Sequence, residues 1–327
     1  MIDQLMLGVR FYLGFAPRFS RIGFNRRGLA GQPVDADLSG QTWLVTGASG
    51  GIGHEIAIAA ARLGARVIAV ARSRPKLDAM AAGLPDGVEL ETLAADLSLV
   101  RETTELVATL GRDGGPVDVL VNNVGVLLND HSVTDEGFET SYATNLLNHY
   151  LLTERLAAGG LLGDGAVIIN MSSGGMYSTP LLPDRLNGLH PDRHDGVMAY
   201  ARHKRAQVVL SRYWNDRFGP EIRSYAMHPG WVDTEGVKTS LPGFRRLFRR
   251  ILRDAPEGAD TALWLGATRP AISREGIWLD RKLDREHVGD ATRCGPEVEA
   301  RLPEVLDEAL ASVSVTAVGD DPARLAG

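Results

Sequence analysis

The sequence has very little cysteine: Cys294 is the only one in 327 residues. A single thiol excludes an internal disulfide and a cysteine-rich metal cluster, and it fits a reducing compartment. The sequence also lacks positive charge, since 35 Lys and Arg residues stand against 41 Asp and Glu residues, a net charge of -6. A domain that binds a nucleic-acid duplex normally carries a large positive excess, so we expect no nucleic-acid partner. The simplest expectation is a cytoplasmic protein with a small-molecule substrate.

The N-terminus has no apolar run long enough to span a bilayer, because Asp3, Gln4 and Arg10 interrupt residues 1–16. The residues that follow are basic and aromatic, which is also typical of a helix on an anionic membrane surface. We interpret residues 1–37 as an N-terminal arm that packs on the protein itself. Peripheral contact with a membrane, through this arm or through residues 244–254, is the alternative.

From Gln41 onward, short apolar stretches alternate with helical ones, and hydrophobic residues make up 44% of the chain, enough for a large core. The expected strands are TWLVTG, 66–70, 88–94, 117–121, 166–171 and 222–227. The expected helices are 52–63, 99–110, 136–158 and 198–218. This alternation predicts an α/β protein with a doubly wound Rossmann fold, a single domain whose central parallel sheet has helices on both faces. A ligand then belongs at the carboxyl ends of the strands.

The expected boundaries place the Rossmann domain at 38–290 and a helical, acidic tail at 291–327. Residues 235–256 are expected to form a lid. Within it, FRRLFRRILRD at 244–254 predicts a helix with arginines on one face. The apolar residues expected on the opposite face are Phe244, Leu247, Phe248, Ile251 and Leu252.

The stretch TGASGGIG, residues 46–53, has two interpretations. As G-x-S-x-G, it would be the nucleophile elbow of a hydrolase that uses Ser49, with His228 as a candidate base. As a glycine-rich turn between a strand and a helix, it would hold the phosphates of a dinucleotide. The turn follows the first strand of the sheet and its glycines continue to Gly53, which favours the dinucleotide. The strict G-x-G-x-x-G fingerprint is absent, so this stretch alone does not decide.

The ends of later strands carry groups that a dinucleotide would need. After the second strand, Ala71 stands where an acid would bind an unphosphorylated ribose, and Arg72 follows. Arginine can pair with a 2′-phosphate, which favours NADP(H) over NAD(H). Asp96 ends the third strand and could accept from an adenine amino group or cap the next helix. The fourth strand ends in NNVG, residues 122–125.

Taken together, TGASGGIG, NNVG, Asn145, the MSS at 171–173, YARHK at 200–204 and HPGWVDT at 228–234 resemble the short-chain dehydrogenase/reductase family. The resemblance runs from about Leu38 to Leu283, with the motifs in the family's order, although NNVG replaces the commoner NNAG. It implies a nicotinamide-dependent oxidoreductase acting on CH–OH groups. We expect the cofactor to contact Gly47, Ser49, Gly50, Gly51, Ile52, Gly53, Arg72, Asp96, Leu97, Asn123, Val124, Gly125, Tyr200, Lys204, Pro229, Gly230, Val232 and Thr234.

The candidate catalytic residues are Asn145, Ser173, Tyr200 and Lys204. Tyr200 and Lys204 are four residues apart, so they share one face of a helix. A charged Lys204 is expected to lower the pKa of Tyr200 from its usual value of about 10, which suits a general acid or base. The resemblance assigns the hydrogen bond with the substrate oxygen to Ser173, rather than Ser172. It assigns Asn145 to a water chain from Lys204 to solvent.

The substrate is expected to be apolar. Residues 176–197 lie between Ser173 and Tyr200 and make that spacing wider than in the plainest family members, so we expect a flap at the substrate mouth. With Trp231 and the 244–254 segment, the flap predicts a pocket for a hydrophobic aldehyde, ketone or secondary alcohol. No metal is expected, because the chemistry needs none. The resemblance implies a homodimer or homotetramer.

Two rival functions stay open at this stage. One is a non-catalytic NADP-binding sensor or scaffold on the same fold, against which the intact Ser173, Tyr200 and Lys204 argue. The other is the Ser49 hydrolase, which leaves Tyr200 and Lys204 without roles.

Overall fold

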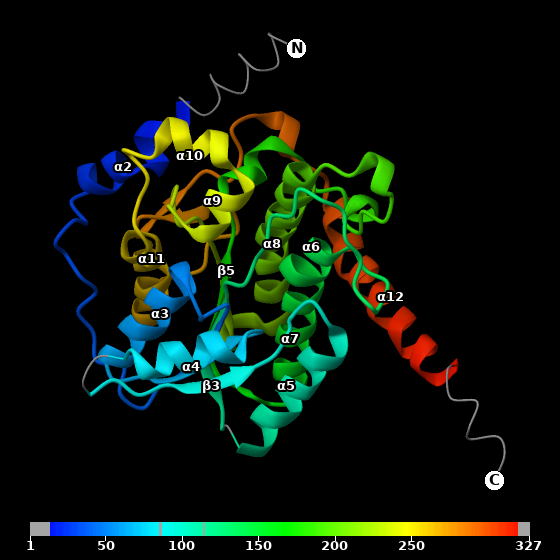
Figure 1. Ribbon diagram of the computed structural model, residues 1–327, viewed down its shortest axis with the longest axis horizontal. Helices are drawn as coiled ribbons and strands as arrows, with labels where there is room; N and C mark the ends of the chain where they lie inside the picture. The colour runs from blue at the N-terminus through cyan, green and yellow to red at the C-terminus, as the bar shows by residue number, and fades with distance from the viewer. Residues whose placement is uncertain (1–13, 85–86, 114, 320–327) are drawn as a thin grey trace.

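The computed structural model describes residues 14–84, 87–113 and 115–319 (Figure 1). The first 13 residues of the arm and the last residues of the tail therefore lie outside the described residues. Within the described ranges, eight strands form one sheet in the order β3-β2-β1-β4-β5-β6-β7-β8, with helices on both sides. The doubly wound Rossmann fold is confirmed.

All six expected strands are present, although β3 begins three residues later than expected. The strands are β1 (Thr42–Thr46), β2 (Arg66–Ala71), β3 (Glu91–Ala94), β4 (Val117–Asn122), β5 (Leu162–Met171), β6 (Arg223–Met227), β7 (Ile277–Leu279) and β8 (Lys282–Asp284). Neighbours from β3 to β7 pair in parallel, and β8 pairs antiparallel to β7. The two-residue turn between β7 and β8 has positive φ at Asp280 and Arg281, 52° and 58°, as a type I′ hairpin requires.

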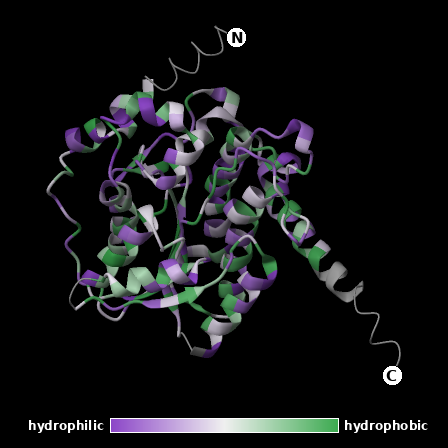
Figure 2. Cartoon of the chain, in the orientation of Figure 1, coloured by the Kyte–Doolittle hydropathy of each residue, from purple (hydrophilic) through white to green (hydrophobic). Residues whose placement is uncertain are grey.

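The helices on the two sides of the sheet enclose separate cores. Along β4, Leu120 points into the core with α5, α7, α8 and α12, whereas Val119 and Val121 point into the core with α3 and α11. Successive residues of a strand face opposite sides, so a strand buried on both sides needs apolar residues throughout. The hydropathy colours of Figure 2 show hydrophobic and hydrophilic residues alternating along the covering helices.

The helices agree with the sequence pattern except at two places. They are α2 (Arg21–Arg26), α3 (Gly51–Arg62), α4 (Arg74–Ala82), α5 (Val100–Asp113), α6 (Thr140–Tyr142), α7 (Asn148–Ala158), α8 (Gly196–Phe218), α9 (Glu235–Ser240), α10 (Pro242–Phe248), α11 (Ala255–Thr268) and α12 (Pro296–Gly319). The expected helix over 136–158 is wrong at its start: one helical stretch runs from Thr140 to Ala158 with a π-helical turn inside it, because the buried Glu139 carboxylate caps this later start by accepting from the backbone of Ser141 and Tyr142.

The expectation of a helix over 244–254 is also wrong, since α10 ends at Phe248. Asp254 instead caps α11: its carboxylate accepts from the backbone of Glu257, and the Glu257 side chain accepts from the backbone of Asp254. This reciprocal capping box fixes the start of α11 at a residue that the sequence pattern had assigned to the preceding helix.

The described part of the N-terminal arm lies against the loop that follows β6. The Phe19 ring stacks on His228 with centroids 4.3 Å apart, and the Phe19 carbonyl accepts from the backbone of Trp231 at 2.7 Å. Phe15 stacks on Phe19 in turn. The arm therefore contributes buried aromatic surface to the wall beside this loop.

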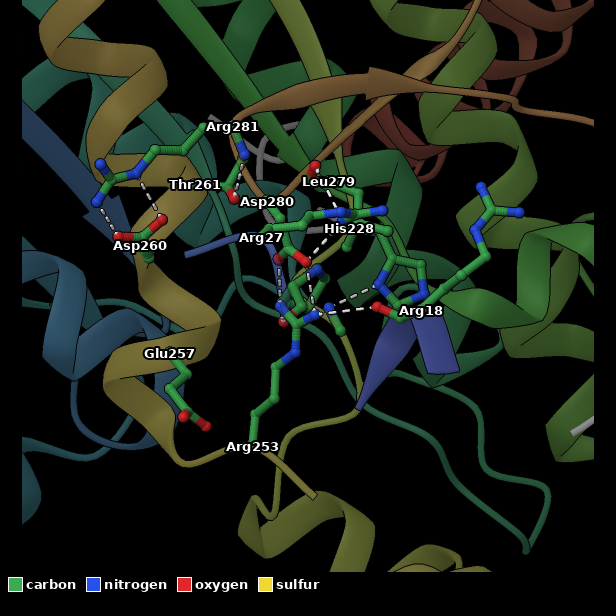
Figure 3. A network of polar contacts seen from close by, with 12 residues as sticks. Arg18, Arg27, His228, Arg253, Glu257, Asp260, Thr261, Leu279, Asp280 and Arg281 are labelled. Atoms are coloured by element: carbon green, nitrogen blue, oxygen red, sulfur yellow. Dashed lines mark hydrogen bonds and ion pairs between the residues drawn. The ribbon is translucent and has the colours of Figure 1, made fainter. Parts of the chain in front are cut away.

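A buried ion pair fastens the arm, the β6 loop and the β7–β8 hairpin together (Figure 3). Arg253 and Asp280 are almost fully buried and pair at 2.5 Å. Arg27 of the arm binds the same carboxylate at 2.6 Å, and the Arg253 guanidinium donates to the carbonyl of Arg18. Asp280 thus neutralises cations from two distant parts of the chain.

Replacing one partner of this pair should destabilise the fold far more than replacing a partner of an exposed pair. Arg253→Leu leaves Asp280 buried with a single cation, and we expect it to lower the free energy of unfolding by about 3–5 kcal/mol in urea denaturation. Arg274→Leu is the control, because Arg274 and its partner Asp216 are 82% and 63% exposed. The control should lose less than about 1 kcal/mol. Equal losses in the two variants would contradict this assignment.

Candidate functional site

Two cavities lie at the carboxyl edge of the sheet, where the sequence predicted a ligand. Their volumes are about 310 and 190 Å³, and both are lined by Gly47 and Val124. Tyr200 and Lys204 line the larger cavity, and Arg72 lines the smaller one. The strand-end motifs therefore surround one continuous region, as parallel strands with a shared carboxyl edge should arrange them.

Glycines form the floor of the larger cavity where β1 turns into α3. Gly47 has φ of 68°, and a Cβ there would lie 3.0 Å from both the Asn123 amide nitrogen and the Val124 Cα. Gly50 caps α3 without a side-chain hydrogen bond, and a Cβ on it would meet open space. The first backbone N–H groups of α3 are thus left without a side-chain cap beside a cavity. This arrangement fits a phosphate group, which needs close backbone approach and the positive end of a helix.

Three of the predicted cofactor residues do not line either cavity. Gly53 lies where α3 meets the turn, and a Cβ on it would collide with Asn123 and the Gly47 carbonyl. Gly230 lies against the Arg253 guanidinium in the same way, and the buried Val232 forms a β-bridge with Arg253. The structure gives these three residues packing contacts within the protein.

Asn123 holds the end of β4 against the glycine turn. Its side-chain amide donates to the Thr46 carbonyl at 2.7 Å, and its backbone N–H donates to the Thr46 hydroxyl at 3.0 Å. Val124 and Gly125 follow in the wall of the larger cavity. Asn123 lines the cavity and also fixes its shape.

The smaller cavity contains the groups predicted to select the nucleotide. Exposed Arg72 follows Ala71 at the end of β2, and Ser49 and Leu97 lie in the same wall. Asp96 also lines it, while its carboxylate accepts from the backbone of Ser98 at 2.9 Å. This contact lies in the turn before α5 and does not cap that helix, because the first N–H groups of α5, those of Val100 and Arg101, donate to the Glu136 carboxylate.

Tyr200 and Lys204 project from the same side of α8, whose start is fixed by Asp195 accepting from the backbone of Met198. The Lys204 Nζ atom lies 5.4 Å from the centre of the Tyr200 ring. Lys204 is buried, and burial lowers its pKa to about 7. Its charged form is held by a hydrogen bond of 2.7 Å to the Met171 carbonyl at the end of β5.

The expected lowering of the Tyr200 pKa does not occur in the free protein. Burial raises the pKa of the Tyr200 phenol, and only a hydrogen bond with Ser173 opposes that effect. The Lys204 ammonium donates to Met171 and Gln207, so the phenol is not among its hydrogen-bond partners. The phenol is therefore protonated at neutral pH, as proton donation to a carbonyl oxygen requires.

The two adjacent serines have different partners. The Ser172 hydroxyl donates to the Lys204 carbonyl at 2.8 Å and so helps to hold α8 against β5. Ser173 is the serine whose side chain reaches the Tyr200 phenol. Ser172, and not Ser173, is among the residues that line the larger cavity. The assignment of Ser173 to the substrate oxygen therefore stays a prediction.

Asn145 lies in a π-helical turn, Ala143–Leu147, that interrupts the helix between α6 and α7. Its side chain clamps the loop after β4: the oxygen accepts from the Val126 N–H at 2.7 Å, and the nitrogen donates to the Val126 carbonyl at 2.8 Å. Single π-turns often occur at functional sites, because the extra residue redirects backbone groups. Here the turn presents the Asn145 carbonyl to Gln207.

The flap and α9 both contact the loop after β4. In α9, Ser240 donates from its hydroxyl to the Leu127 carbonyl at 2.6 Å and accepts at its carbonyl from Asn129. In the flap, His194 lies 3.2 Å from the Leu128 carbonyl. Several residues in the cavity walls are not among the site residues that the sequence predicted. These are Ala71, Ala95, Val126, Leu128, Thr140, Thr144, Met171, Ser172, Glu235 and Gly236.

At the β6 end of the larger cavity, Pro229 and Thr234 lie in the wall. The Thr234 hydroxyl caps α9 by accepting from the backbone of Val237. His228, the candidate base of a Ser49 hydrolase, accepts from the backbone of Gly230 at 2.7 Å and stacks on Phe19. Burial lowers the pKa of His228 to about 3. His228 is thus committed to packing of the loop and does not line the cavity that contains Ser49.

Metal and membrane features were sought in the part of the chain that the structure describes. There, no group of three or more His, Cys, Asp or Glu side chains could hold a metal ion. Likewise, none of the described helices is long and apolar enough to cross a membrane.

The comparisons with known proteins agree with the site. The family profile for short chain dehydrogenases matches residues 41–183. Dehydrogenase/reductase SDR family member 12 of Bos taurus is 34% identical over 84% of this chain and 88% of its own length. Retinol dehydrogenase 12 of Bos taurus is 33% identical over 70% and 74%.

Among solved structures, the angucycline C-6 ketoreductase LanV with bound NADP has a TM-score of 0.58 and 26% identity, covering 71% of this chain and 90% of its own. The fold, the site and the sequence relatives therefore lead to the same family. The chain belongs to the short-chain dehydrogenase/reductase family of NAD(P)-dependent oxidoreductases.

Proposed function

We propose that the protein uses NADP(H) to interconvert a hydrophobic carbonyl compound and its alcohol, with Tyr200 as the general acid and base. One observation carries the proposal: Tyr200 and Lys204 line the same cavity as the uncapped N-terminus of α3 and its glycine turn. A group that transfers protons and a cradle for phosphate thus open onto one space. Neither a hydrolase nor a purely structural domain requires both features in one cavity.

The residues that would hold the cofactor come from the ends of β1, β2, β3, β4 and β6 and from α8. When bound, the nicotinamide cofactor supplies or takes up a hydride. The backbone N–H groups at Gly50 and Gly51 would bind its diphosphate, and Arg72 would pair with a 2′-phosphate. Lys204, Pro229 and the other predicted contacts would orient the rest of the molecule.

The catalytic roles follow from which groups at the site can donate or accept a proton. In the reductive direction, the protonated Tyr200 phenol donates a proton to the substrate oxygen. Ser173 hydrogen-bonds the same oxygen and stabilises its developing charge. The Lys204 ammonium stabilises the phenolate that Tyr200 becomes. In the oxidative direction, the phenolate accepts the proton, and such general acid–base catalysis is worth about 10²–10⁴ in rate.

A lipophilic substrate is supported by an aromatic cluster next to the loop after β6, which contributes Pro229 to the larger cavity, and by the relatives. Trp231 packs on Phe244 and Phe248 of the lid, with ring centroids 5.1 and 4.9 Å apart. Residues 176–197 add the proposed flap. The proteins similar to this chain include a retinol dehydrogenase and an angucycline ketoreductase.

We also propose peripheral contact with an anionic membrane through α2 and α10, which lie side by side (Figure 1). A backbone hydrogen bond from Arg21 to Ile251 joins the two segments. Ile22 and Leu247 are exposed on them, Leu247 to 64%. The exposed cations on the same two helices and the turn that follows are Arg26, Arg246, Arg249 and Arg250. Apolar side chains between arginines are typical of surfaces that bind anionic lipid.

Tyr200→Phe should separate binding from chemistry. The variant keeps the ring and loses the proton, so we expect NADPH still to bind while carbonyl reduction falls at least about 100-fold. NADPH fluorescence measures binding, and a panel of lipophilic aldehydes and ketones measures turnover. Binding without turnover of any panel member by the native protein would instead favour a nucleotide sensor. Activity that survives in the variant would rule out Tyr200 as the proton donor.

Arg72→Gln should weaken the binding of NADPH about tenfold and leave NADH binding unchanged, because only NADPH carries the 2′-phosphate that we pair with Arg72. Arg74→Gln is a matched control, since Arg74 is also an exposed cation, two residues away at the start of α4. Fluorescence titration of both variants with both cofactors makes the comparison. A loss that is equal for NADPH and NADH, or equal in the two variants, would contradict the role of Arg72.

The two reaction directions should respond oppositely to pH. Burial raises the pKa of Tyr200, so its proton is present at neutral pH and is lost only as pH rises through that raised value. Reduction needs the proton, so its kcat should hold at neutral pH and decline in the alkaline range. Oxidation needs the phenolate, so its kcat should rise over the same range. Measured pH profiles that run in the same direction for both reactions would exclude Tyr200 as the shared acid and base.

A further inference from the structure

Gln207 lies behind Lys204, one turn further along α8, and is 1% exposed. Its side-chain oxygen accepts from the Lys204 ammonium at 3.2 Å. Its side-chain nitrogen donates to the Asn145 carbonyl at 2.6 Å and lies 3.1 Å from Nδ1 of His149. None of the motifs that place the chain in its family includes this residue. It nevertheless connects two of the predicted catalytic residues directly.

The chemistry of the neighbours allows only one orientation of the Gln207 amide. The Lys204 ammonium has donors and no acceptor, so the amide oxygen must face it. The Asn145 carbonyl has only acceptors, so the amide nitrogen must face that side. Burial and the charge of Lys204 lower the pKa of His149 to about 3, so its neutral ring can accept at Nδ1. Every polar atom of the amide then has a partner of the correct kind.

We propose that Gln207 is a positioning residue that holds the Lys204 ammonium in its charged form and fixes it relative to the π-helical turn at Asn145. The Gln207 amide links Lys204 to the Asn145 carbonyl through protein atoms. An amide hydrogen-bonds at both ends but does not pass a proton along. Gln207 therefore serves to orient the cation and not to relay the proton of Tyr200.

The need for such a residue follows from the burial of Lys204. A buried ammonium loses its hydration, and only hydrogen bonds to the charged form or nearby anions can compensate. The titratable side chains around it are Tyr200 and His203 on α8 and His149 on α7, and none of these supplies a negative charge at neutral pH. The Met171 carbonyl and the Gln207 oxygen are the acceptors that hold it. Loss of either acceptor should make the ammonium easier to deprotonate.

The test is an NMR titration of the lysine Cε carbons in the free full-length protein. The sequence has four lysines, Lys76, Lys204, Lys238 and Lys282, so Lys204→Met identifies the Lys204 signal. Gln207→Met keeps the size of the side chain and removes the acceptor, so the midpoint of Lys204 should fall by about one pH unit. Gln207→Glu places a carboxylate at the same atom, so the midpoint should rise by about as much.

Ser211→Ala is the control, because Ser211 is a buried polar residue one turn beyond Gln207 and accepts from Asn170 at 2.8 Å without contacting Lys204. It should lower the melting temperature and leave the Lys204 midpoint unchanged. A role of Gln207 limited to filling space predicts unchanged midpoints in both of its variants, and that result would overturn the inference. If Gln207→Met does not fold, Gln207→Glu still tests the inference, because the inference requires the titration midpoint of Lys204 to rise in that variant.

The importance of Gln207 for catalysis rests on the proposed function, whereas the titration does not use activity. The two can therefore fail separately. If the native protein reduces a carbonyl and Tyr200→Phe does not, but the Lys204 midpoint is unchanged in both Gln207 variants, only the role of Gln207 is ruled out. If the Lys204 midpoint falls in Gln207→Met and rises in Gln207→Glu, but the native protein reduces no carbonyl, the positioning role stands and the proposed reaction is ruled out.

Discussion

The buried charge of Lys204 is the constraint around which the site is organised. An ammonium that has left water must donate its protons to protein acceptors, and here those acceptors come from different elements. The Met171 carbonyl ends β5, and the Gln207 amide lies on α8 and reaches the turn at Asn145. Satisfying one cation therefore fixes a strand, a helix and a π-helical turn relative to one another. The proposed proton donor, Tyr200, lies on the helix that this arrangement orients.

A second buried charge organises the opposite wall of the site. Asp280 binds Arg253 next to the loop after β6 and also binds Arg27 from the N-terminal arm. The aromatic contact of Phe19 with His228 adds packing to the same junction. The arm, although outside the predicted catalytic domain, thereby supports the loop that we expect to contact the nicotinamide. Substitutions in the arm that remove these contacts should therefore change the position of this loop in the site.

Much of the architecture could be predicted because strong local patterns agreed with the topology. Buried parallel strands read as apolar runs, and their carboxyl ends share one edge, so polar motifs far apart in the sequence had to meet there. The position of Tyr200 and Lys204 on one face of α8 followed from their spacing alone. The glycine turn at Gly47 was predicted for the same reason, since only glycine accommodates its backbone and its close neighbours.

The features that escaped prediction depend on tertiary contacts. The short strands β7 and β8 have too few residues to show a pattern, and their turn is held by the ion pair of Asp280. The capping carboxylates of Glu139 and Asp254 set the starts of two helices at positions that the hydrophobic pattern did not mark. The burial that raises the pKa of Tyr200, and the bridge made by Gln207, become visible only when α7, α8 and β5 are packed together.

The most direct test of the account is the transfer of the reacting hydrogen itself. NADPH labelled with deuterium at the reactive C4 position of the nicotinamide would be incubated with the protein and a lipophilic ketone, and the alcohol would be analysed by mass spectrometry. The account predicts an alcohol that carries one deuterium on the carbon of the former carbonyl. An absence of labelled alcohol from every ketone tested, under conditions in which NADPH is bound, would contradict it.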